Sequence, residues 1–175
     1  MGNASNPAFR LLDEADDHPG ARVRRIGGLT LWAETLAVRT TAASEFLDVT
    51  DQVAAVVRRS RISQGWVSAF SKHTTAAVVL QENEPLLLQD MGGVLERLAA
   101  AAGVYQHNDL SRRTGEMDPD ECANGHAHCQ HLLLSSSQDI PVAEGRLDLG
   151  RWQRIFLLEL DRGRDRQLVV QVFGA

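Results

Sequence analysis

The sequence predicts an α+β domain built mostly from antiparallel strands, with two or three helices. Segments typical of strands outnumber segments typical of helices. The two kinds do not alternate along the chain, as they would in a doubly wound α/β fold. The 175 residues are enough for one domain with a sizeable core. We therefore expect a single α+β domain over residues 29–175.

The first 28 residues are set apart by their composition. They are polar, include four acidic residues between positions 13 and 17, and show neither a helical nor a strand period. We expect residues 1–28 to form an N-terminal extension that is at least partly disordered.

The domain begins with two segments that suit paired strands. Residues 29–38 alternate in part between apolar and polar side chains, and residues 45–49 suit a hairpin partner for them. Thr50 is placed to cap a helix that ends near Ile62, because valines follow it at helical spacing.

A turn rich in functional groups separates the next two predicted strands, residues 65–71 and 76–82. Residues 84–100 then read as a helix, and its apolar side chains are expected to face inward. These side chains are Leu87, Leu88, Met91, Val94, Leu95 and Leu98.

The second half of the chain opens with a long polar loop over residues 103–121, of the kind that is often functional. A short helix is predicted from about residue 123 to 134. Three strand candidates follow, at residues 140–149, 153–160 and 167–174. They complete the expectation of a mostly antiparallel fold.

Composition and charge narrow the classes of function. The formal net charge of −5 argues against a general nucleic-acid binder. No apolar run approaches the roughly 20 residues of a membrane-spanning helix, and the N-terminus lacks a secretory signal. We expect a cytoplasmic protein with no membrane partner, in which Cys122 and Cys129 are reduced thiols.

Histidines suggest a metal site. Five of the six fall at strand ends, in the long loop or near the short helix, namely His73, His107, His126, His128 and His131. Zinc needs three or four such ligands from converging elements. His128 and His131 share a face of a helix, whereas His126 and His128 share a side only if that stretch is extended. The alternative, ordinary polar histidines at element ends, stays open because no strict zinc signature is present.

The turn over residues 72–75 suits an anion. Lys72, Thr74 and Thr75 offer an ammonium group and two hydroxyls, and the backbone N–H groups of a tight turn can add to them. Arg112 and Arg113 in the long loop are candidates for a bidentate clamp on the anion. Turn-forming threonines and solvated arginines are the alternative. Two pairs of carboxylates, Glu82 with Glu84 and Glu159 with Asp161, could each share a strand face and point into a site. The alternative is that they are exposed acids at strand ends.

Several of these segments together resemble one known family. They are "HTTA" (73–76), "ENEP" (82–85), "YQHND" (105–109), "NGHAH" (124–128), "IPVAEGRLDLGRWQRIFLLELD" (140–161) and "VFG" (172–174). Over residues 29–175 the chain is similar to the YjbQ family of small cytoplasmic proteins, described as secondary thiamine-phosphate synthases.

The resemblance implies an α+β fold with antiparallel sheets, assembled as a homotrimer, and a transferase activity on small phosphorylated substrates. The reaction joins hydroxymethylpyrimidine diphosphate to a thiazole phosphate and releases pyrophosphate. The family pattern carries over onto His73, His107 and His128 as catalytic and metal-ligating residues, with Glu159 near the same cleft. The implied cofactor is a divalent metal, zinc or magnesium. The implied substrate-binding residues are Lys72, Thr74, Thr75, Asn108, Asp109, Arg113, Asn124 and Gly125.

Two positions depart from the family pattern. Gln130 stands where many members have a lysine, and Ala175 replaces the usual terminal acidic residue. A non-catalytic metal- or anion-binding homo-oligomer is the alternative function. For the trimer, the apolar strands near residues 154–160 and 168–173 are expected nearest the threefold axis, with Trp152 as a core anchor beside them.

Overall fold

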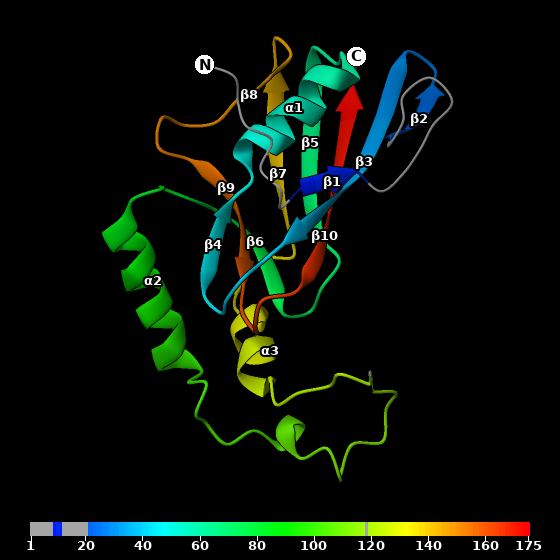
Figure 1. Ribbon diagram of the computed structural model, residues 1–175. Helices are drawn as coiled ribbons and strands as arrows, with labels where there is room; N and C mark the ends of the chain where they lie inside the picture. The colour runs from blue at the N-terminus through cyan, green and yellow to red at the C-terminus, as the bar shows by residue number, and fades with distance from the viewer. Residues whose placement is uncertain (1–8, 12–20, 118) are drawn as a thin grey trace.

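Two antiparallel sheets and three α-helices make up the part of the chain that the computed structural model describes, residues 9–11, 21–117 and 119–175 (Figure 1). Within that part, the larger sheet has seven strands in the order β1-β3-β10-β5-β7-β8, and β2 also pairs with β3. Its strands are β1 Phe9–Leu11, β2 Ala21–Ile26, β3 Leu29–Arg39, β5 Gln64–Ser71, β7 Ser137–Ala143, β8 Arg146–Leu147 and β10 Asp165–Gly174. The predicted α+β fold class is confirmed.

The smaller sheet corrects one predicted pairing. It has the order β4-β9-β6, with β4 at Glu45–Asp48, β6 at Ala76–Gln81 and β9 at Arg154–Glu159. The hairpin predicted between residues 29–38 and 45–49 is wrong, because β4 pairs antiparallel with β9. Alternation marks a segment as a strand but leaves its partner open, and here the buried central strand β9 takes both neighbours.

The main core lies between the larger sheet, the smaller sheet and α1, which spans Thr50–Ser60 (Figure 1). Val53, Val56 and Val57 of α1 are fully buried in this core, as their helical spacing predicts. Thr50 does not cap the helix as expected. Val49 stands at the N-cap, and the Thr50 hydroxyl instead accepts a hydrogen bond from Ile155 N at 2.8 Å, which ties α1 to β9.

The helix α2, Pro85–Leu98, begins where the sequence predicts, because the Glu84 side chain accepts hydrogen bonds from Leu86 N and Leu87 N. The predicted inward orientation is wrong for Val94 and Leu98, which are exposed, whereas Leu87, Leu88 and Met91 are half-buried. Leu95 is its one buried residue, whereas Leu98 is 62% exposed. In Figure 1 the helix stands beside the smaller sheet, and Leu95 belongs to a second core cluster with Ala77 of β6 and Leu158 of β9.

A short 3-10 helix, η1 at Gln106–Asn108, and the helix α3, Gly125–Leu132, complete the described elements. Both lie where the sequence predicts a functional loop and a short helix, and α3 sits at the end of the smaller sheet (Figure 1). Among the described residues, no helix is long and apolar enough to cross a membrane.

Two further expectations concern the edges of the fold, and the second of them is wrong. Of the predicted extension 1–28, residues 9–11 and 21–26 form β1 and β2 on the edge of β3, and residues 1–8 and 12–20 lie outside the described part. Trp152 is not a core anchor: it is 58% exposed, and the Arg151 guanidinium lies 4.5 Å from the centre of its ring.

Candidate functional site

The loop between β9 and β10, residues 160–164, is held rigidly beside the end of β3. Thr40 N donates to Arg164 O at 3.0 Å, and Arg164 N donates back to the Thr40 hydroxyl at 2.9 Å. Gly163 packs so closely that an added Cβ would lie 2.6 Å from the Thr41 carbonyl oxygen. Charged side chains on this loop are therefore presented from a fixed backbone.

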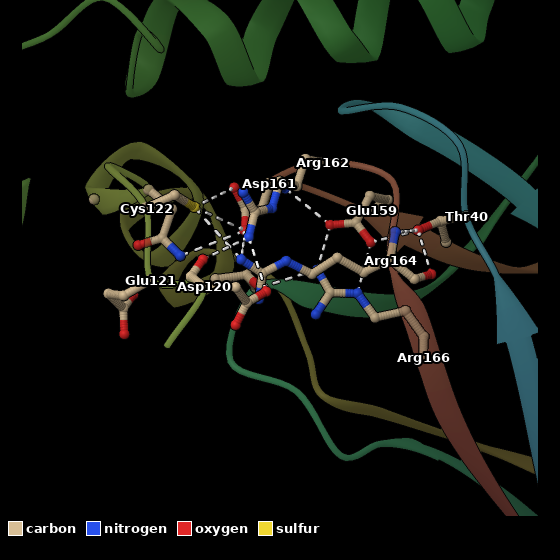
Figure 2. A network of polar contacts seen from close by, with 12 residues as sticks. Thr40, Asp120, Glu121, Cys122, Glu159, Asp161, Arg162, Arg164 and Arg166 are labelled. Atoms are coloured by element: carbon tan, nitrogen blue, oxygen red, sulfur yellow. Dashed lines mark hydrogen bonds and ion pairs between the residues drawn. The ribbon is translucent and has the colours of Figure 1, made fainter. Parts of the chain in front are cut away.

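A buried ion pair connects this loop to the two strands around it (Figure 2). Glu159 at the end of β9 and Arg166 in β10 form a bidentate pair, with Arg166 Nε donating to Glu159 Oε2 at 2.6 Å. Their side chains are 0% and 3% exposed. Burial alone would raise the pKa of Glu159, but hydrogen bonds from Arg166, Asp161 N and Thr40 hold it below its ordinary value.

Glu159 therefore has a structural partner for each oxygen. Its Oε2 also accepts from the Thr40 hydroxyl at 2.8 Å, and its Oε1 accepts from Asp161 N at 2.9 Å. The Thr75 hydroxyl accepts from Arg166 at 3.1 Å and is buried with it. Glu159 and Thr75 thus position the charged network, while Thr74 and Lys72 are exposed on the turn.

His73 is fixed by the backbone of β10. Gln167 N lies 2.7 Å from His73 Nε2, so this ring nitrogen accepts the hydrogen bond. Burial, followed by the positive charge of Arg166, lowers the pKa of His73 from its ordinary value of 6.5 to about 4. A half-buried, neutral imidazole therefore stands beside the ion pair.

His107 of η1 and His128 of α3 form the second part of the site. Their ring centroids are 4.7 Å apart at an interplanar angle of 69°. Burial, with the neighbouring His107, lowers the pKa of His128, and Asp161 and Glu121 act in the opposite direction. His107 Nε2 is buried without a hydrogen-bond partner in the described part of the chain. The sequence prediction that these two histidines meet is correct.

The loop before α3 is fixed against η1. The Asn108 side chain accepts a hydrogen bond from Gly125 N at 2.8 Å, and an added Cβ at Gly125 would lie 2.5 Å from Tyr105 Cβ. Asn108 and Gly125, both predicted to bind substrate, hold η1 against α3. Asp109 is engaged locally, because its carboxylate accepts from the Ser111 hydroxyl at 2.6 Å.

Asp161 joins the two parts, and sequence reasoning left its role open. Its carboxylate lies 3.1 Å from an Arg164 guanidinium nitrogen and accepts from Asn124 Nδ2 at 3.4 Å, and the Cys122 thiol is 3.7 Å away (Figure 2). Arg164 also donates to Cys122 Sγ at 3.4 Å. Two polar atoms here, Asn124 Oδ1 and Arg164 Nε, are buried and unpartnered among the described residues.

The sequence analysis missed Arg164 and Arg166. The available signal was the spacing of charged residues in "LELDRGRDRQLVV", where charges interrupt two strongly apolar strands. By contrast, Arg113, predicted to clamp phosphate, forms an ion pair with Glu121 at 3.3 Å. Arg162, on the same loop as Arg164, forms an ion pair with Asp120, in which Arg162 Nη2 lies 3.1 Å from Asp120 Oδ2.

The predicted three-histidine metal set does not fit this arrangement. Among the described residues, no three His, Cys, Asp or Glu side chains are grouped to hold a metal ion. A ligating histidine usually donates its second ring N–H to an acceptor, whereas His73 Nε2 itself accepts from Gln167 N. His126 is buried with Nδ1 unpartnered, and His131 lies 3.4 Å from the Ser136 hydroxyl. A divalent metal, zinc or magnesium, stays a prediction.

The arrangement is suited to binding an oxyanion. Neutral histidines, the guanidinium groups of Arg164 on the loop and Arg166 at the start of β10, and the exposed ammonium group of Lys72 bring N–H donors and a cation to one end of the smaller sheet. The two buried carboxylates are neutralised by their arginine partners. Neutral histidines next to fixed cations favour electrostatic stabilisation over transfer of a proton.

Comparison with known proteins agrees with this fold. A family model described as "UPF0047 protein YjbQ-like" matches residues 34–175. A UPF0047 protein of Methanothermobacter thermautotrophicus is 35% identical over 146 residues, which cover 83% of this chain and 94% of the relative. The UPF0047 protein YugU of Bacillus subtilis is 29% identical over 142 residues, covering 81% of this chain and 98% of YugU.

Solved structures extend the similarity to three dimensions. A YbjQ-like protein of unknown function from Sulfolobus solfataricus aligns with a TM-score of 0.74 and 32% identity, over 84% of this chain and 99% of that one. A hypothetical protein from Aeropyrum pernix K1 aligns with a TM-score of 0.71 and 32% identity, over 82% and 98%. With the family model matching most of its length, the chain belongs to the YjbQ family.

Proposed function

We propose that the protein is an enzyme for small phosphorylated substrates, with a transferase reaction of the thiamine-phosphate synthase type. The observation that carries the proposal is the fixed cluster of donors and cations around His73 and Arg164. Close to it, Asn124 Oδ1 and Arg164 Nε are buried without partners in the described chain. Such unpartnered polar groups are costly unless a ligand satisfies them.

The residue types match the demands of this reaction. The bond between the methylene carbon of hydroxymethylpyrimidine diphosphate and its leaving oxygen breaks, and the thiazole nitrogen forms a new bond to that carbon. Negative charge develops on the departing pyrophosphate, and fixed cations and N–H donors stabilise it. Lys72, Arg164 and His73 supply these groups, whereas Glu159 acts indirectly by holding Arg166.

Turnover by the purified protein tests the proposal. We expect thiamine phosphate and pyrophosphate to form in equal amounts from the two precursors, and the rate to fall at least tenfold, about 1.4 kcal/mol, in Arg164→Gln. The matched control is Arg146→Gln, which should keep the wild-type rate. Arg146 lies on β8 and forms an exposed ion pair with Glu144. Absence of condensation, together with no reaction on a panel of phosphate esters, would contradict the proposal.

A second candidate is a non-catalytic metal- or anion-binding homo-oligomer, and the surface of α2 supports the association of copies. Leu86, Val94 and Leu98 on this helix are exposed, and Val104 after it is almost fully exposed. Clusters of exposed apolar side chains are typical of protein interfaces. We propose a homotrimer in either case. Light scattering should give three times the chain mass, and a monomer mass across micromolar concentrations would contradict the trimer.

A further inference from the structure

The hydrogen bond at His73 determines where its ring carries a proton. A backbone N–H group can only donate, and Gln167 N is 2.7 Å from His73 Nε2. His73 Nε2 must therefore offer its lone pair. A neutral imidazole has one N–H group and one acceptor nitrogen, so the proton of His73 lies on Nδ1.

The surroundings hold the ring in this state. A protonated ring would place a hydrogen on Nε2, directly against the N–H of Gln167. Three cations, Arg166, Lys72 and Arg164, also disfavour a further positive charge at His73, and the Glu159 carboxylate acts in the opposite direction. Burial of the ring, the largest cause, and these cations lower the pKa of His73 to about 4. His73 is therefore a neutral Nδ1–H donor near neutral pH.

The Nδ1–H group is available to a ligand. Among the described residues it has no hydrogen-bond partner, since the contacts of the His73 side chain are confined to Nε2. The His73 residue is half-buried, so part of its surface stays accessible. It lies on a turn tied to β10 on both sides, because Lys72 N donates to Gln167 O at 3.3 Å and Arg166 donates to Thr75.

We propose that His73 donates its Nδ1–H to an oxygen of a phosphate or diphosphate group, and that it is not a metal ligand. The identity of this ligand rests on the proposed function, but the tautomer does not. Binding a metal at Nδ1 would remove the only N–H of the ring while Nε2 stayed bound to a donor. This is the reverse of the usual arrangement, in which the second nitrogen of a ligating histidine donates.

The tautomer gives His73 a defined use in the site. A neutral donor fixed by the backbone stabilises negative charge on an oxyanion without releasing a proton to it. Hydrogen bonds to a charged acceptor are also stronger than those between neutral groups. The positive charge itself comes from Lys72 and Arg164, which are both electrostatic neighbours of His73.

Nitrogen-15 NMR of the full-length protein with labelled histidine tests the tautomer. Near neutral pH, His73 should show a protonated Nδ1 and an unprotonated Nε2, with its signals identified by their loss in His73→Asn. Adding inorganic pyrophosphate should move the Nδ1–H resonance downfield. A protonated Nε2, or a metal-type shift of either nitrogen on adding zinc, would overturn the proposal.

Calorimetry with inorganic pyrophosphate separates the two ring positions. His73→Asn keeps an amide N–H near the place of Nδ1 and should bind within about threefold of the wild type, whereas His73→Gln should bind about tenfold more weakly, 1.4 kcal/mol. Equal binding by all three proteins, or no binding by the wild type, would overturn the proposal. Binding with the expected Nδ1 shift but no turnover would support this inference and contradict the synthase reaction.

Discussion

Replacing Glu159 with glutamine should destabilise the fold more than any surface charge substitution. The variant keeps the size of the side chain but removes the negative charge that faces Arg166. Both side chains are almost fully buried, and Glu159 accepts two hydrogen bonds from the Arg166 guanidinium group. Removing one partner of a buried pair leaves an uncompensated charge away from bulk solvent.

The expected loss follows from this burial. Breaking a buried, hydrogen-bonded pair costs about 3–5 kcal/mol of unfolding free energy. The matched control is Asp165→Asn, whose pair with Arg39 is at 3.1 Å but has side chains 84% and 58% exposed. Exposed pairs contribute about 0–1 kcal/mol, so the control should differ little from the wild type.

Urea unfolding at neutral pH measures both variants, and pH adds a second check. The pKa of Glu159 is lowered in the folded state from its ordinary value of 4.5. The stability that ionised Glu159 gives to the fold is therefore fully present above pH 4.5 and is lost as the pH falls through the lower folded-state pKa. The stability gap between wild type and Glu159→Gln should narrow in acid. A gap no larger than that of the control at neutral pH would refute the reasoning.

Three further variants address the site. Gly163→Ala should lower the free energy of unfolding in urea by about 1–3 kcal/mol, because the added Cβ would collide with the backbone at Thr41. Gly115→Ala is the control and should leave this free energy unchanged, because the space around Gly115 is open. Equal effects of the two substitutions would contradict the close packing of the loop. Arg164→Gln should weaken the binding of inorganic pyrophosphate, measured by calorimetry, by about tenfold. Arg162→Gln is the control and should bind as the wild type does, because the Arg162 guanidinium group pairs with Asp120. Weaker binding by Arg162→Gln than by Arg164→Gln would show that Arg164 is not part of the site. Lys72→Ala should weaken the same binding by about tenfold at low salt and less at high salt, and a loss independent of salt would contradict its role as an exposed cation.

The sequence predicts most strands correctly because their apolar periodicity is strong. Residues 65–71, 76–82 and 167–174 are predicted as strands and correspond to β5, β6 and β10. Strand pairing is different, since β4 lies beside β9, more than a hundred residues later. Pairing depends on which surfaces are buried together, and local preference does not encode it.

Some features of the candidate site could likewise be predicted from the sequence, and others could not. The approach of His107 to His128 was predictable through the family resemblance, which linked two distant motifs. The buried pair of Glu159 and Arg166 was not, because charged residues are expected at the surface unless their partner is known. The proton position on His73 could not be predicted either, since it depends on a backbone N–H group from another strand.

A crystal structure of the full-length protein with inorganic pyrophosphate tests the central claim most directly. The account predicts a phosphate oxygen within hydrogen-bonding distance, about 2.7–3.2 Å, of His73 Nδ1, with the Arg164 guanidinium facing the same group. His73 Nε2 should remain bound to Gln167 N, as it is without ligand. Pyrophosphate bound elsewhere on the protein, or a His73 ring turned to present Nε2 to the ligand or to a metal, would contradict the account.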